Sequence, residues 1–234
     1  MRTIHFFLDF DGTIANTDVV DLVLDRFADK KWKDVEKEWV SGRIGSRECL
    51  TRQMDLVRAT PQEIRSAISH VKLDPHFVSF IQKAEELGVL VTIVSDGFDL
   101  FIEQVLKQNL QSKPGILKAL PVFSNKVEMT SGGLKAVFAS DKPCAHGCAN
   151  CKQALIKKMT SVDDHVFFVG DGFSDRYAAR EAHLTFAKEG LLDYCRENDI
   201  DHIAYKNFKK VEEWLSENYP ILKKTRVIRK GARE

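Results

Sequence analysis

Three apolar runs of this chain end at an acidic or hydroxyl residue, with glycine close by: Asp9–Thr13, Ser95–Gly97 and Gly170–Asp175. A lone Asp-Gly pair between two strands favours a hairpin turn. Here helical patterns follow all three runs, which indicates parallel strands instead. Parallel strands end at the same edge of a sheet, where open α/β folds bind ligands. We therefore expect five side chains to meet in one crevice: Asp9, Asp11, Ser95, Asp171 and Asp175.

The four carboxylates of this set indicate the chemistry that such a crevice could perform. Carboxylates this close repel one another unless a cation lies among them. Mg²⁺ is the natural candidate, since it prefers oxygen ligands and keeps water molecules that a phosphate can displace. Phosphoryl transfer also needs an in-line nucleophile, a proton donor for the leaving oxygen and donors for the other phosphoryl oxygens. An aspartate can be that nucleophile through an aspartyl-phosphate intermediate.

The apolar pattern predicts the elements that position these residues. Four strand-length runs are expected in a buried parallel sheet: residues 4–8, 89–94, 165–169 and 184–187. Between them a helix is predicted from Asp74, as its N-cap, and Pro75 to the terminating Gly88. Strands that alternate with helices predict an α/β fold, with a doubly wound, mainly parallel sheet in a Rossmann-like core.

The segment 18–73 interrupts this alternation because it contains no strand-like run. Its apolar residues recur at helical spacing, and Thr60–Glu63 form a capping box with proline at the first helical position. We therefore expect an inserted cap of about four helices. A small β-hairpin is predicted within 122–138, with its turn at Ser131–Gly133.

The predicted organisation has three parts. The α/β catalytic core comprises residues 1–17 and 74–222, the helical cap domain comprises 18–73, and a basic tail comprises 223–234. The tail is rich in Lys and Arg and has no apolar stripe, which is typical of a solvated segment rather than of a nucleic-acid contact.

The order of the motifs resembles that of the haloacid dehalogenase-like phosphatases. Four features match in type and spacing: Asp9–Thr13 after one strand, Ser95 after a second, Lys152 at a helix start and Gly170–Asp175 after a third strand. The resemblance covers nearly the whole chain. Asp11 favours phosphate esters over haloacids, because the dehalogenating members of the family lack this second aspartate.

The resemblance implies a role for each motif residue. Asp9 would attack phosphorus, and Asp11 would protonate the leaving alcohol and then activate water against the aspartyl phosphate. The phosphate-binding residues would be Ser95, Gly97 and Lys152. The metal-binding residues for Mg²⁺ would be Asp9, Asp11 through its backbone carbonyl, Asp171, and Asp175 as a direct or indirect partner.

The helical insertion resembles the cap of the phosphoserine-phosphatase-like branch, and a cap that closes over a crevice supplies substrate contacts. Serine-specific members hold the ammonium with a cap Glu and the carboxylate with a cap Arg. The matching positions here are Asp18 and Gln53, with Arg52 adjacent, and Gly12 replaces a common Ser. These departures weaken a phosphoserine assignment, which stays the alternative. Asp18 and Arg52 are the candidate substrate contacts, although Arg52 could equally belong to a solvated face.

A closer resemblance is to the branch that dephosphorylates 2-hydroxy-3-keto-5-methylthiopentenyl-1-phosphate in methionine salvage. The shared features are the cap length, the segment from Ser46 to Arg52, the cysteine loop that runs into Lys152, and the pattern from Tyr194 to Phe208. The resemblance implies a small phosphate ester as the partner, and this ester as the substrate.

The cysteine loop carries its own alternatives. Cys144, Cys148 and Cys151 lie within eight residues. With His146 as a fourth ligand they could form a closed Cys₃His site for Zn²⁺, although His146 lies close in sequence to its neighbours. Free or redox-active thiols are an equal alternative, and an incidental loop is a third. Because the loop runs into Lys152, anything that fixes the loop would position that lysine.

The composition argues against other classes of protein. There are 35 Lys and Arg against 34 Asp and Glu, a net charge of +1, which argues against a nucleic-acid-binding surface. No apolar run approaches the roughly 18 residues of a membrane span, and the N-terminus lacks a signal-peptide pattern. We therefore expect a cytoplasmic protein that binds neither nucleic acid nor membrane. The sequence does not indicate an oligomeric state.

One alternative comes from a different functional class. A non-catalytic phospho-acceptor or Mg²⁺-binding regulatory module could use Asp9 only as a phosphorylation site. Asp11 and Lys152 argue against it, because a module that merely holds phosphate has no use for an acid that protonates a leaving group.

Overall fold

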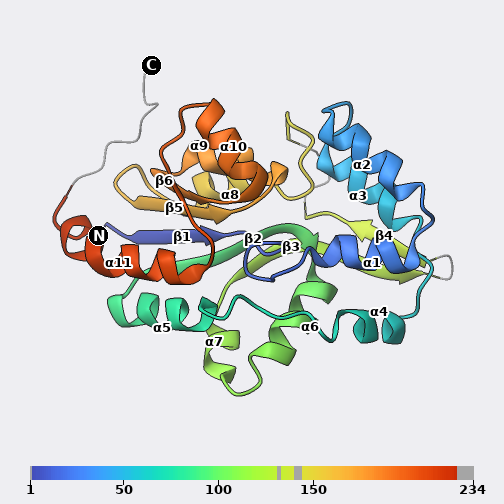
Figure 1. The fold of residues 1–234 in the computed structure, drawn as a ribbon, viewed down its shortest axis with the longest axis horizontal. Coiled ribbons are helices and arrows are strands. Elements are labelled where there is room, and N and C mark those ends of the chain that lie inside the picture. Colours follow the sequence, from blue (N-terminus) through green and yellow to red (C-terminus); the bar gives the residue numbers. More distant parts are fainter. Residues whose placement is uncertain (1, 131–132, 140–143, 226–234) are drawn as a thin grey trace. The chain divides into compact units, whose positions relative to one another are not determined.

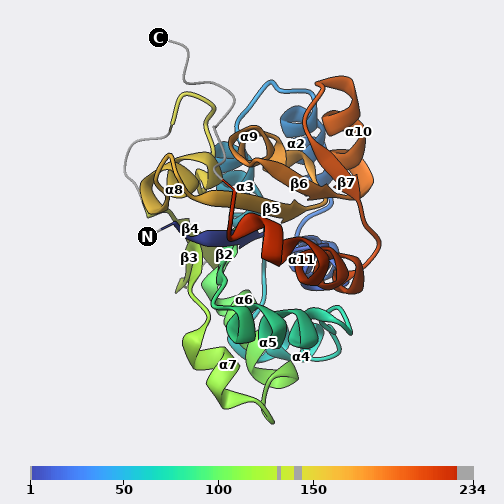
Figure 2. The ribbon, with the colours of Figure 1, turned by 90° about the vertical axis from the view of Figure 1, so that its left-hand side faces the viewer.

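The computed structural model describes residues 2–130, 133–139 and 144–225, and Figures 1 and 2 show its ribbon from two directions. The described residues form a mostly parallel sheet with the strand order β4-β3-β2-β1-β5-β6-β7. They also divide into two compact units. Unit 1 comprises residues 2–9, 74–93 and 152–225, and unit 2 comprises 10–73, 94–130, 133–139 and 144–151.

Unit 1 contains the parallel part of the sheet. Its strands are β1 (Ile4–Leu8), the first residues of β2 (Leu90–Phe98), β5 (His165–Gly170), β6 (Leu184–Ala187) and β7 (His202–Ala204). Each pairs in parallel with its neighbour. All residues of β1 and β5 are buried, as expected of apolar strands that are covered on both faces. The predicted doubly wound α/β core is therefore confirmed.

Helices cover both faces of this sheet. On one side lie α5 (Phe77–Leu87) and α11 (Phe208–Leu222), and on the other lie α8 (Lys152–Met159), α9 (Arg176–Glu181) and α10 (Glu189–Glu197) (Figures 1 and 2). Aromatic side chains fill the α5 and α11 side: Phe6 of β1 lies 5.4 Å from Phe80 of α5, and Trp214 of α11 lies 5.0 Å from Phe167 of β5, between ring centroids. Edge-to-face pairs of this kind add to the stability that burial supplies.

The start of α5 differs from the prediction. The helix begins at Phe77 rather than at Pro75, because the Asp74 carboxylate accepts from the amide of His76 (2.8 Å) and from that of Phe208, at the start of α11 (3.2 Å). Asp74 therefore closes a turn ahead of the helix and ties it to α11. The predicted end is confirmed, since Gly88 follows the helix at a φ of 66°, which favours glycine.

Unit 2 contains the helices expected in the insertion. They are α1 (Val19–Phe27), α2 (Trp32–Val40), α3 (Ser46–Met54) and α4 (Pro61–Ile68). The capping box of α4 is present as predicted, with the Thr60 hydroxyl accepting from the Glu63 amide and the Glu63 carboxylate accepting from the Thr60 amide. The same unit contains α6 (Asp99–Asn109), the helix expected after the Ser95–Gly97 run, and α7 (Pro114–Ala119), which the sequence did not predict.

The predicted hairpin is also present in unit 2. Strands β3 (Val122–Thr130) and β4 (Gly133–Val137) pair antiparallel, with Thr130 opposite Gly133. Residues 131 and 132 of the predicted turn, and residues 226–234 of the predicted tail, lie outside the described residues. Among the helices that the structure does describe, none has both the length and the apolar composition needed to cross a membrane.

Candidate active site

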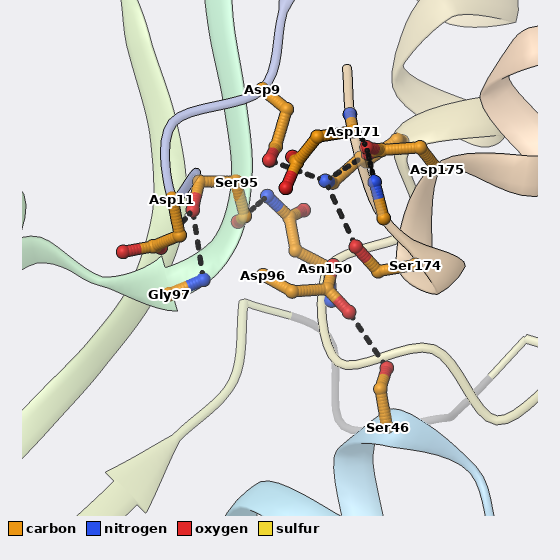
Figure 3. Close-up of polar contacts among 12 residues, drawn as sticks. Asp9, Asp11, Ser46, Ser95, Asp96, Gly97, Asn150, Asp171, Ser174 and Asp175 are labelled. Atoms are coloured by element: carbon orange, nitrogen blue, oxygen red, sulfur yellow. Dashed lines mark hydrogen bonds and ion pairs between the residues drawn. The ribbon is translucent and has the colours of Figure 1, made fainter. Parts of the chain in front are cut away.

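Unit 1 gathers acidic side chains at the carboxyl ends of β1 and β5. Asp9 directly follows β1, and its amide donates to the Val169 carbonyl of β5 (2.9 Å), so the two strand ends stay side by side. The carboxylates of Asp9 and Asp171 point toward one another (Figure 3). Each of these carboxylates and that of Asp175 has one oxygen within 4.8 Å of an oxygen of the other two. We call these three residues with Lys152 the aspartate–lysine cluster.

Lys152 is the first residue of α8, and its side chain is only 2% exposed. Its ammonium donates to the carboxylates of Asp9 and Asp175, each at 2.5 Å, and to the Ser174 hydroxyl at 3.3 Å. A buried ammonium needs such partners, because burial of an unpaired charge is costly. One ammonium faces three carboxylates here, so the cluster keeps a formal negative excess.

Asp175 organises the loop that follows β5. Its side chain is fully buried, and its Oδ2 accepts from the amides of Asp171 and Gly172, both at 3.1 Å. A Cβ at Gly170 would collide with this carboxylate, so glycine is required there. Asp175 thus fixes both the loop that carries Asp171 and the ammonium of Lys152. Gly170 was named in the sequence only as the first residue of the Gly170–Asp175 motif, although a glycine at a strand end often marks such a close approach.

Unit 2 contains a second polar group, which we call the Asp11–Ser95 group. Asp11 Oδ1 accepts from the Val19 amide at the start of α1 (2.9 Å), and Asp11 Oδ2 accepts from the Ser95 hydroxyl (3.3 Å). The Gly97 amide donates to the Ser95 hydroxyl (2.9 Å). A Cβ at Gly97 would lie 2.6 Å from Asp11 Oδ2, so only glycine fits beside this carboxylate. The structure thus brings together Asp11, Ser95 and Gly97, as predicted for three of the site residues.

A network that sequence reasoning missed lies next to this group (Figure 3). The Asp96 carboxylate accepts from the Ser46 hydroxyl of α3 (2.7 Å) and, at 3.4 Å, from the Asn150 amide. The Asn150 side chain donates to the Ser95 carbonyl (2.9 Å) and to the Phe123 carbonyl (3.0 Å). The network therefore connects the Ser95 turn, the start of α3 and the residue that lies two positions before Lys152.

The cysteine loop also belongs to unit 2. The sulfur atoms of Cys144, Cys148 and Cys151 lie within 4.8 Å of one another, and none of the three is in a disulfide. His146, the predicted fourth ligand, is exposed and is not part of this group. The neighbouring thiols and burial raise the pKa of Cys148, with the Cys151 contact as the largest cause.

The two candidate cap contacts have partners within unit 2. Asp18 caps α1 by accepting from the Asp21 amide (2.8 Å). Arg52 donates through both terminal nitrogens to the two carboxylate oxygens of Glu38 (2.9 and 3.0 Å) and so joins α3 to α2. Gln53, at the position where serine-specific relatives carry Arg, is buried and donates to the Glu36 carboxylate (2.9 Å).

The predicted five-residue set thus appears as two groups, one in each unit. Unit 1 contains Asp9, Asp171 and Asp175, and unit 2 contains Asp11 and Ser95. The chain itself joins the groups, because a single residue, Phe10, separates Asp9 from Asp11. Their convergence on one crevice stays a prediction.

The sequence pattern of the haloacid dehalogenase-like hydrolases matches residues 6–180, a range that includes every residue of both groups. The chain belongs to this family.

Known proteins similar to this family member share most of its length. The 2-hydroxy-3-keto-5-methylthiopentenyl-1-phosphate phosphatase of Bacillus cereus (strain B4264) is 27% identical over 91% of this chain and 96% of that protein. The bifunctional enzyme MtnB/MtnX of Bacillus licheniformis is 28% identical over 93% of this chain and 52% of that enzyme, so the chain spans about half of it. A substrate-bound phosphoserine phosphatase structure aligns with a TM-score of 0.67 over 92% of this chain and 99% of that one; at 19% identity it shows the shared fold.

Proposed function

We propose that this chain is a Mg²⁺-dependent phosphatase that hydrolyses a small phosphate monoester through an aspartyl-phosphate intermediate. The observation that carries the proposal is the aspartate–lysine cluster, in which Asp9 follows a buried strand and lies against Lys152 and Asp171. The family membership supports the proposal, since the matched range 6–180 includes these residues.

The reaction divides between Asp9 and Asp11. The Asp9 carboxylate attacks phosphorus, and the bond to the leaving alcohol breaks as Asp11 gives that alcohol a proton. Asp11, now a carboxylate, then takes a proton from the water that attacks the aspartyl phosphate, which releases phosphate and restores Asp9. The contact of Asp11 with the Ser95 hydroxyl and the Val19 amide holds the carboxylate in one orientation for both steps.

The residues that bind the phosphoryl group in this proposal are Ser95, Gly97 and Lys152. The Ser95 hydroxyl and the Gly97 amide are hydrogen-bond donors for phosphoryl oxygens, and the Lys152 ammonium supplies positive charge. Lys152 is already buried and held by Asp9 and Asp175, so little side-chain freedom is lost when substrate binds.

The donor set of the cluster fits Mg²⁺. The three carboxylate oxygens that lie within 4.8 Å of one another are hard ligands, and one ammonium leaves them formally negative. The Asp9 and Asp171 carboxylates and the Asp11 carbonyl would hold the ion. When bound, the ion would supply positive charge to the phosphoryl oxygens. Asp175 accepts from two loop amides and from Lys152, which favours its role as an indirect partner.

The proposed substrate is 2-hydroxy-3-keto-5-methylthiopentenyl-1-phosphate. Curated relatives with this name match over most of the chain. The cap observation points the same way, since Gln53 is buried against Glu36 and presents no cation for the carboxylate of phosphoserine. We propose that specificity resides in segment 18–73, and that the protein acts in the cytoplasm on a small-molecule ester.

A substrate panel tests this function. Purified protein is assayed against p-nitrophenyl phosphate, the methylthiopentenyl ester and phosphoserine, with and without Mg²⁺. We expect turnover only with Mg²⁺, and the highest kcat/KM for the methylthiopentenyl ester. A higher kcat/KM for phosphoserine would overturn the proposed substrate but would still support the proposed phosphatase activity. If no ester turns over while Asp9 still accepts phosphate from acetyl phosphate, the chain is a regulatory phospho-acceptor instead.

A further inference from the structure

The three cysteines of unit 2 form a donor set that the phosphatase reaction does not use. Their sulfur atoms lie within 4.8 Å of one another, although successive cysteines are four and three positions apart in the sequence. In a tetrahedral zinc site, Zn–S bonds of about 2.3 Å place the sulfurs about 3.8 Å apart. Small rotations of the side chains would therefore bring the three sulfurs to ligand positions.

The backbone of the loop is already folded around these sulfurs. The Gly147 amide donates to the Cys144 carbonyl (2.9 Å), and Gly147 adopts a φ of 65°, so the chain turns sharply between the first two cysteines. The Cys148 amide donates to Cys144 Sγ (3.4 Å). Metal-bound ligands commonly have such hydrogen bonds from their surroundings, which fix their orientation.

The loop is also anchored to the start of α3 in its own unit. The Gly147 carbonyl accepts from the Arg47 amide (3.0 Å), and the Ala149 amide donates to the Ser46 hydroxyl (2.9 Å). A Cβ at Gly45 would collide with the Gly147 carbonyl, so the backbones of the loop and of the start of α3 approach closely. The three cysteines thus lie in a structured turn that is hydrogen-bonded to the start of α3.

We propose that Cys144, Cys148 and Cys151 bind one Zn²⁺ as thiolates, with solvent in the fourth position. Thiolates are soft ligands that select Zn²⁺ over Mg²⁺. On binding, the three thiols release their protons to solvent, and the cation then offsets the repulsion among the thiolates. A disulfide could join only two of the three sulfurs, whereas a metal ion uses all of them.

The expected consequence is order in the loop that leads to Lys152. Cys151 directly precedes this lysine, and Asn150 is bonded to the Ser95 carbonyl. A metal that joins Cys151 to Cys144 and Cys148 closes two short loops and restricts the chain at the start of α8. The metal would thus act as a structural support and take no part in the reaction.

The primary test measures metal content and needs no enzyme assay. Protein purified under reducing conditions with added zinc is analysed by elemental mass spectrometry, and the expected content is one zinc per chain. Replacement by Co²⁺ should give the thiolate-to-cobalt charge-transfer absorption of a sulfur-rich site. A wild-type protein that binds neither metal stoichiometrically would overturn the proposal, and this measurement depends on no variant that could fail to fold.

Variants assign the ligands. The triple variant Cys144→Ala, Cys148→Ala, Cys151→Ala should lose at least nine-tenths of the zinc, whereas Cys195→Ala, which removes a thiol in unit 1, should keep it. His146→Ala should also keep it, because His146 is exposed and lies outside the sulfur group. Zinc retained by the triple variant, or lost from His146→Ala, would contradict a three-thiolate site. Circular dichroism checks that each variant is folded.

Hydrogen exchange tests the structural consequence. Amides of residues 144–151 should exchange more slowly in the zinc-loaded protein than in the stripped protein, while those of α1 and α4 should not change. Equal exchange of the loop in both forms would show that the metal does not order it. Because the measurement uses no substrate, failure of the proposed phosphatase reaction would leave this result standing, and the reverse also holds.

Discussion

The two clusters of possible metal ligands differ in chemistry and in the unit that holds them. Unit 1 offers carboxylate oxygens beside a buried ammonium, whereas unit 2 offers the sulfurs of three half-buried cysteines within one loop. Oxygen ligands suit a hard ion that keeps water and exchanges readily, and thiolates suit a softer ion that stays bound. One short segment, Asn150–Lys152, runs from the second cluster into the first. If both proposals hold, ligand type alone assigns a reactive metal and a structural metal to separate sites of one chain.

The largest expected effect is that of replacing Asp9, which should abolish turnover without changing the cysteine cluster. Asp9→Asn removes the nucleophile, so turnover of p-nitrophenyl phosphate should fall by at least about 10⁴-fold. The zinc content should stay at the wild-type value, because no sulfur is touched. The matched control is Asp193→Asn, at an exposed carboxylate of the same unit, which should keep full turnover. If Asp9→Asn kept its turnover, Asp9 would not be the nucleophile and the oxygen cluster would not have the proposed reactive role.

Removal of divalent metal and re-addition of Mg²⁺ should affect the two clusters differently. Removal of free divalent metal with a weak chelator should abolish turnover while the sulfur-bound zinc remains, because thiolates hold Zn²⁺ tightly. Adding Mg²⁺ should then restore activity. Parallel assays of turnover and bound zinc after each step check this result. If zinc alone restored turnover, or if activity followed zinc content instead of Mg²⁺, the assignment of ions to clusters would be reversed.

Asp11→Asn should have the next largest effect. Loss of a general acid and base costs typically 10²- to 10⁴-fold in kcat. The asparagine retains an acceptor for the Val19 amide, so α1 should keep its start and the zinc its site. The kinetic constants on p-nitrophenyl phosphate test this, with Asp55→Asn as a control at an exposed carboxylate of unit 2. An unchanged kcat would show that another group handles both proton transfers.

The smallest expected effects are on thermal stability. A carboxylate substitution should shift Tm in opposite directions in the two units. In unit 1, burial favours the protonated form of Asp164, but hydrogen bonds from Ser161 and Thr3 outweigh it and lower its pKa to about 2. In unit 2, burial is the largest cause that raises the pKa of Asp21 to about 7, helped by the nearby carboxylates of Asp18, Glu36 and Asp25 and opposed by Lys33.

The sign of each contribution follows from proton linkage. The lowered pKa of Asp164 stabilises the fold above its ordinary value of 3.8, and this stability is lost as pH falls toward 2. The raised pKa of Asp21 gives stability that is present below 3.8 and is lost as pH rises through about 7. Above pH 7, Asp164→Asn should therefore lower Tm by a few degrees and Asp21→Asn should raise it. Thermal unfolding across this pH range checks both variants, and shifts of equal sign would contradict the comparison.

Much of the fold was predictable because its core elements are local patterns. The apolar runs of β1 and β6 coincide with the strands, and the capping box gives the start of α4. Elements that depend on distant partners were missed. Strand β7 has three residues, too few for a pattern, and α5 starts later than predicted because Asp74 binds the start of α11.

The candidate site divides in the same way. Asp9 and Asp171 were predictable as candidates because each directly follows a buried strand, and Asp11 because it lies two positions after Asp9 in the same acidic loop. The network around Asp96 was not, since it joins Ser46 and Asn150 from distant parts of the sequence. Polar residues of these types are common in turns, so only the fold distinguishes them.

The most direct test of the central claim is chemical trapping of the intermediate. Protein is mixed with Mg²⁺ and p-nitrophenyl phosphate, quenched with acid and treated with borohydride, which reduces an acyl phosphate to an alcohol. Peptide mass spectrometry should then find residue 9 reduced to homoserine, at a higher level in Asp11→Asn because release of phosphate is slower there. Substrate turnover with no reduction at residue 9, or with reduction at another carboxylate, would contradict Asp9 as the nucleophile.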